Sequence, residues 1–98
     1  MEETNMAQKA TIAPLQYAPP LGPHPALYGT GEPNYFVDVA VSNTGQVLGT
    51  GRVEPGGQWR VELTINTGEW IQVQARCYAT KNAPISNTEW SDPVSIYG

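Results

Sequence analysis

Hydrophobic and polar residues alternate along most of this chain, in short runs separated by turns that contain glycine or proline. In the run 59–65 the apolar positions are Trp59, Val61, Leu63 and Ile65, with polar or charged residues between them. Successive side chains of a β-strand point to opposite faces, so this period of two is typical of a strand with one buried and one solvated face. The pattern therefore predicts strands.

Seven such runs can be traced, and turn signals separate them at the spacing of about 8–12 residues expected of a sandwich of two antiparallel sheets. The runs are 10–16, 24–31, 34–42, 46–54, 59–65, 69–80 and 90–98. Asn-Thr-Gly occurs twice as a turn signal, and glycine interrupts 46–54, which favours a bulged or edge strand. No window has the i, i+3, i+4 spacing of a helix. The chain is predicted to be all-β.

Length and composition indicate one domain, because 98 residues can bury a single modest core. Residues 1–10 are polar without periodicity, and we expect them to be a disordered lead-in or the remnant of a tag; the folded domain is predicted at 11–98. The first 14 residues contain no apolar segment of the kind found in a signal peptide, and no later run is long enough to cross a bilayer.

The charge balance restricts the class of partner. Nine acidic against five basic residues leave a formal net charge of −4, and no basic cluster occurs. This argues against binding of nucleic acid and against a polybasic membrane patch, while membrane insertion is not expected because no run is long enough to span a bilayer. The single cysteine excludes an intrachain disulfide. Cys77 shares the phase of Ile71 and Val73, so it is predicted to be a buried thiol without catalytic function.

Three stretches carry a family resemblance. "GTGEPNYFVDV" (29–39) resembles the G-x-G-x-P-x-x-x-V-x-V opening of bacterial immunoglobulin-like domains, and "GTGRVEPGGQWRVEL" (49–63) resembles their G-x-W-x-V hairpin. "ARCYATKNAPISNTEWSDPVSI" (75–96) is similar to the W-S-x-P-V ending that these domains share with fibronectin type III modules. The resemblance covers about residues 11–98 and lacks the cysteine pair of antibody domains.

The resemblance implies an immunoglobulin-like antiparallel β-sandwich that serves, without catalysis, as a spacer or adhesion unit. Such domains occur in tandem repeats on bacterial secreted or cell-surface proteins, so the implied location is extracellular as part of a longer exported chain. The implied partners are neighbouring domains of that chain, a polysaccharide or a surface protein. Two alternatives stay open: a carbohydrate-binding accessory module of a polysaccharide-acting enzyme, and a decoration or tail domain of a phage virion.

Aromatic residues are the candidate ligand contacts. Trp59 is in phase with the core positions of its strand, whereas Trp70 is out of phase and should face outward. Trp70, Trp90, Tyr78 and Arg76 could form a surface on which sugar rings stack, or they could cover the rim of the sandwich. Arg76 above Trp90 would be a cation–π pair worth roughly 0.5–1 kcal/mol.

No catalytic, metal or cofactor site is predicted, so the chain is not expected to be an enzyme. His24 lies between two prolines with no second histidine or cysteine nearby, and is expected to be solvated. The outward-phase acids are interpreted as solubilising groups, because no D-x-D-x-D loop for calcium occurs. These acids are Asp38, Glu62 and Glu69, together with Glu89 and Asp92 on either side of Trp90.

Overall fold

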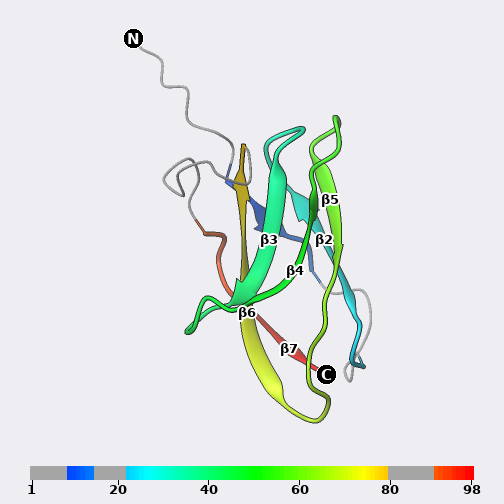
Figure 1. Cartoon of the computed structure of the whole chain (residues 1–98), viewed down its shortest axis with the longest axis vertical. Coiled ribbons are helices and arrows are strands. Elements are labelled where there is room, and N and C mark those ends of the chain that lie inside the picture. Colours follow the sequence, from blue (N-terminus) through cyan, green and yellow to red (C-terminus); the bar gives the residue numbers. More distant parts are fainter. Residues whose placement is uncertain (1–8, 15–21, 80–89) are drawn as a thin grey trace.

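The computed structural model describes residues 9–14, 22–79 and 90–98, and within these ranges every element is a β-strand and no helix occurs. Each of the seven predicted runs overlaps one strand (Figure 1). The strands are β1 (Thr11–Ile12), β2 (Ala26–Thr30), β3 (Phe36–Val41), β4 (Val47–Arg52), β5 (Gln58–Glu62), β6 (Trp70–Tyr78) and β7 (Val94–Tyr97). The all-β prediction is confirmed.

Two antiparallel sheets form a sandwich-like pair of layers around one core. One sheet has the order β1-β2-β5, and the other has the order β4-β3-β6-β7. The inward phases of the strands meet between the sheets, as the alternation predicted. The buried core consists of Ala10, Leu27, Val37, Val39, Val53, Trp59, Val61, Leu63, Ile65, Val73, Ala75, Cys77 and Ile96.

Strand β4 is an edge strand with a bulge, as its glycines indicated. Its pairing with β3 shifts by one residue after Val39, so that Val39 lies opposite Gly49 while Ala40 lies opposite Val47. A Cβ atom on Gly49 would stand 2.5 Å from the carbonyl oxygen of Glu62 in the other sheet. Glycine is therefore required for β4 and β5 to approach each other, side by side in Figure 1.

The stretch 49–63 is not a hairpin, contrary to the prediction. β4 pairs with β3, and β5 pairs with β2, so the turn after β4 carries the chain from one sheet to the other. Gly57 adopts φ +89° there, and its N–H donates to the carbonyl of Glu54 at 2.8 Å. A tight turn between two alternating runs looks the same in sequence whether the runs pair or pack across a core, and here the glycines of β4 allow the packing.

The amino-terminal boundary differs slightly from the predicted one. Ala10, assigned to the lead-in, is fully buried in the core just before β1. Lys9 is exposed, and the prediction of disorder for residues 1–8 lies outside the described residues.

Candidate binding surface

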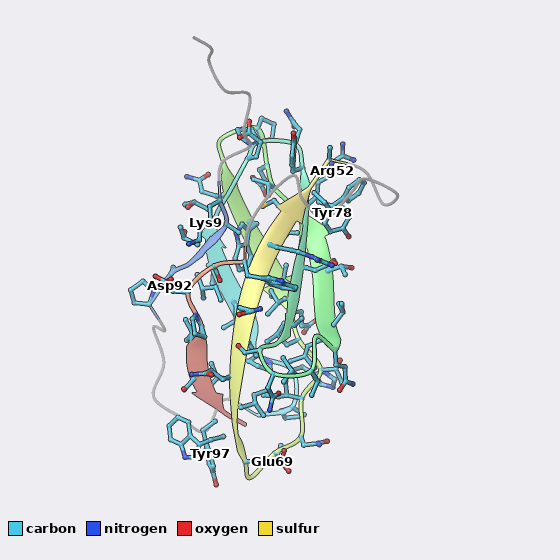
Figure 2. The ribbon with its side chains drawn as sticks, turned by 90° about the vertical axis from the view of Figure 1, so that its left-hand side faces the viewer. Lys9, Arg52, Glu69, Tyr78, Asp92 and Tyr97 are labelled. Carbon is cyan, nitrogen blue, oxygen red and sulfur yellow. The ribbon has the colours of Figure 1, made fainter. Side chains whose placement is uncertain are left out.

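The outer face of the four-stranded sheet holds the predicted ligand-binding residues, because the even-numbered residues of β6 point away from the core. Val73, Ala75 and Cys77 are buried, which places Trp70, Gln72, Gln74, Arg76 and Tyr78 on the opposite face. This outer face extends over β3, β4 and β7 through the register of the strands. Figure 2 shows Tyr78 and Arg52 at one end of it and Tyr97 at the other.

At the first end, aromatic rings stack on one another and on an arginine side chain. Phe36 lies between Arg52 on β4 and Tyr78 on β6. The Arg52 guanidinium carbon is 5.1 Å from the centroid of the Phe36 ring, and the Phe36 and Tyr78 rings stack at 5.6 Å with 25° between their planes. Phe36 is therefore half-buried and contacted from both neighbouring strands, so it is less open to a ligand than an exposed ring.

The predicted cation–π pair of Arg76 and Trp90 is confirmed. The guanidinium carbon lies 4.5 Å from the centroid of the indole ring. Ser91 fixes this contact to β6: its N–H donates to the carbonyl of Ala75 at 2.7 Å, and its hydroxyl accepts from the Ala75 N–H at 2.9 Å. Trp90 is thereby held over Arg76, and the half-buried indole acts as cover for the sheet.

Asp38 corrects one prediction about the acids. Its phase was read as solvated, yet the residue is 8% exposed, and its Oδ1 accepts a hydrogen bond of 2.9 Å from the Tyr78 hydroxyl. The cause is that the outer face is itself covered by side chains from the neighbouring strands. Asp38 therefore holds the Tyr78 ring in place, whereas Glu62, Glu69 and Asp92 are exposed as expected. Glu89 lies outside the described residues.

Tyr78 gives the domain a predicted pH dependence. Burial, and then the hydrogen bond to and the charge of Asp38, raise the pKa of Tyr78 from 10.0 to about 12. Between these values the folded chain retains a proton that the unfolded chain has lost, so stability is complete below pH 10 and falls as the pH rises toward 12. Urea unfolding between pH 9 and pH 12 should show this loss in the wild type and a weaker one in Tyr78→Phe.

A charge variant separates the causes of this effect. Asp38→Asn removes the negative charge and lowers the pKa of Tyr78 in the folded chain, so its loss of stability should still begin near pH 10 but should be smaller, and complete at lower pH, than in the wild type. Wild-type and Tyr78→Phe curves with equal slopes above pH 10 would show that Tyr78 does not carry the effect.

Trp70 lies at the other end of the same face and is 64% exposed, as its phase predicted. Because a strand rises about 3.3 Å per residue, Trp70 and Tyr78 are about 26 Å apart along β6. The four predicted residues therefore do not form one surface. Arg76, Tyr78 and Trp90 are grouped at one end, and Trp70 pairs instead with Tyr97 of β7, with ring centroids 5.2 Å apart and 48° between the planes.

Tyr97 was missed by the sequence reasoning. Its neighbour Ile96 shows the core phase of β7, so the outward position of Tyr97 could have been read from the sequence. Its position opposite Trp70 could not, because that depends on the register of β6 and β7.

Three other residues considered in the sequence, Trp59, Cys77 and His24, lie as expected. Trp59 is 2% exposed, and its indole N–H donates to the Thr30 carbonyl at 3.0 Å, so the core assignment is confirmed. Cys77 is buried as predicted, and burial raises the pKa of its thiol. This disfavours the reactive thiolate. His24 is exposed.

Within the described residues, no three His, Cys, Asp or Glu side chains lie close enough together to hold a metal ion. Nor does that part of the chain contain a helix long and apolar enough to cross a membrane. Comparison of the chain with protein-family models, with curated proteins and with solved structures finds no match.

Proposed function

We propose that this chain is an immunoglobulin-like β-sandwich module that acts without catalysis, as a spacer or interaction unit of a bacterial secreted or cell-surface protein. The strand order is the observation that carries the proposal. In immunoglobulin-like domains strands A, B and E share one sheet, and strands C, F and G share the other, to which C′ is added in variable-type domains. With β1, β2 and β5 as A, B and E, the second sheet of this chain follows the order C′-C-F-G.

The residues that carry the family resemblance also interlock, which supports the same proposal. Gly29 of the first motif leaves room for the Trp59 ring of the second, since a Cβ atom there would stand 2.5 Å from Cζ2 of that ring. Thr30 accepts the Trp59 N–H. Ser91 of the third motif exchanges two hydrogen bonds with the backbone of β6. Packing or hydrogen bonding thus explains the presence of these residue types in each of the three motifs.

The positions of the first and last strands support a spacer. Thr11 of β1 pairs with Thr30, at the end of the sandwich where Gly31 packs against Cys77. Gly98, which follows β7, accepts a hydrogen bond from Gly68 in the turn before β6, at the opposite end (Figure 1). The start of β1 and the end of β7 therefore lie at opposite ends of the sandwich, a geometry suited to holding two neighbours apart.

The exposed Trp70, paired with the half-buried Tyr97, favours a second candidate in the same non-catalytic class, a carbohydrate-binding accessory module. A spacer and a binding module are compatible, because the pair lies on the outer face of the sheet.

Pulling on the chain tests the spacer role. In single-molecule force spectroscopy with marker domains on both sides, we expect one unfolding event with a gain in contour length on the order of 300 Å for residues 11–98. One core shared by both sheets should break as a unit. Trp70→Ala serves as the control and should leave the unfolding force unchanged. Extension without a force peak, or in several small steps, would contradict the proposal.

A further inference from the structure

The face around Trp70 differs from the rest of the outer sheet because its aromatic ring is not covered by an arginine. We define the Trp70 surface as Trp70 and Gln72 of β6 with Ser95 and Tyr97 of β7. Trp70 lies opposite Tyr97, and Gln72 lies opposite Ser95, so the four residues form two adjacent rows across the strand pair. Trp70, Gln72 and Ser95 are exposed, and Tyr97, whose ring contacts the Trp70 indole, is half-buried.

The Trp70 ring has the properties of a stacking platform. It is 64% exposed, and Tyr97 supports it from one side in a tilted rather than a parallel arrangement, which leaves ring surface open. The face of an aromatic ring is electron-rich and attracts the partly positive C–H groups on the flat side of a pyranose ring. By contrast, the guanidinium group of Arg76 lies over the Trp90 ring, and that of Arg52 lies over the Phe36 ring. Trp70 is therefore the tryptophan suited to stacking.

The polar part of the surface matches hydroxyl groups. A glutamine amide offers two donors and an acceptor, and a serine hydroxyl offers a donor and two acceptor lone pairs, so Gln72 and Ser95 can each hydrogen-bond a sugar hydroxyl in either sense. Ligand sites commonly combine aromatic walls with a few such groups.

The charges exclude one kind of glycan. None of the four residues of the Trp70 surface is charged, and Glu69 borders it at the end of the sheet, as Figure 2 shows beside Tyr97. Arg76 is six residues further along β6 and engaged with Trp90. An anionic polysaccharide would find no cation among the four residues of this surface and would be repelled by Glu69 and by the net charge of −4.

We propose that the Trp70 surface binds a neutral polysaccharide, with Trp70 stacking on a pyranose ring and Gln72 and Ser95 hydrogen-bonding its hydroxyl groups. This inference rests on the proposed non-catalytic module and names the ligand class of its interaction surface.

Affinity gel electrophoresis tests the inference with native gels that contain soluble β-glucan, xylan, galactomannan or dextran, and with polygalacturonate as the anionic comparison. At least one neutral polysaccharide should retard the wild-type chain, and polygalacturonate should not. Trp70→Ala should weaken the interaction by about tenfold or more, as expected for an aromatic anchor. The Gln72→Ala/Ser95→Ala double variant should also weaken it. Tyr28→Ala, which removes an exposed tyrosine from the other sheet, is the matched control and should bind as the wild type does.

Several results would overturn the inference. They are the absence of retardation in all neutral gels, equal retardation of wild type and Trp70→Ala, and stronger retardation by polygalacturonate. Sedimentation that shows a dimer lost in Trp70→Ala, without glycan binding, would instead make this surface a contact between copies of the chain. The force experiment separates the two proposals. A single unfolding event without glycan binding would support the spacer module and contradict only the proposed polysaccharide ligand.

Discussion

Replacing Trp59 with alanine should lower the free energy of unfolding by about 3–5 kcal/mol, the range found when a buried large aromatic residue is truncated. Trp59 is among the core residues shared by the two sheets, and only 2% of it is exposed. The substitution removes the ring and also leaves the Thr30 carbonyl without its indole donor. Urea unfolding followed by circular dichroism measures the change.

Two variants show which part of Trp59 matters. Trp59→Phe keeps most of the apolar volume but cannot donate to Thr30, so its free energy of unfolding should lie between that of the wild type and that of Trp59→Ala. Trp70→Ala removes the same side chain from an exposed position and should cost less than about 1 kcal/mol. Equal destabilisation by Trp59→Ala and Trp70→Ala would contradict the assignment of one ring to the core and the other to the surface.

Gly29→Ala should destabilise the domain by about 3 kcal/mol, the upper end of the usual cost of overpacking. The added Cβ atom would overlap the backbone carbonyl oxygen of Thr11 and stand 2.5 Å from Cζ2 of Trp59. Neither neighbour can move easily, since Thr11 belongs to β1, which pairs with β2 on that side, and Trp59 is packed in the core. The free energy of unfolding in urea is again the measurement.

Gly56→Ala is the matched control for Gly29→Ala. A Cβ atom at Gly56 would meet only the end of the flexible Gln58 side chain, at 3.1 Å, so the cost should be below about 1 kcal/mol. In a Trp59→Ala background, Gly29→Ala should cost less than in the wild type but not become neutral, because the Thr11 carbonyl remains. Strict additivity of the two substitutions would show that the ring and the glycine do not share this space.

The candidate surface could be read from the sequence only in part. The phase of each strand correctly placed Trp59 inside and Trp70 outside, because burial follows from the apolar residues at i+2 and i+4. The Arg76–Trp90 contact was also correctly expected. The partner of Trp70 and the buried position of Asp38 were not, because both depend on residues of other strands.

Asp38 illustrates why an outward phase does not guarantee exposure. Its carboxylate is covered because the rings of Phe36 and Tyr78 lie on the same outer face, and Tyr78 reaches it from the neighbouring strand. A local pattern indicates which face of its own strand a residue occupies. It carries no information on how far side chains from adjacent strands extend over that face.

The sequence by itself determined the all-β class, the seven strands and the faces they bury, since alternation and turn residues act within a few positions of the chain. Only the tertiary structure decided that β4 and β5 lie in different sheets, that β6 brings Trp70 to Tyr97, and that the predicted aromatic group divides into two. Backbone hydrogen bonds between strands are chemically alike in every pairing. Pairing is therefore chosen by long-range packing, such as the approach of β5 that Gly49 permits, and not by any local run of residues.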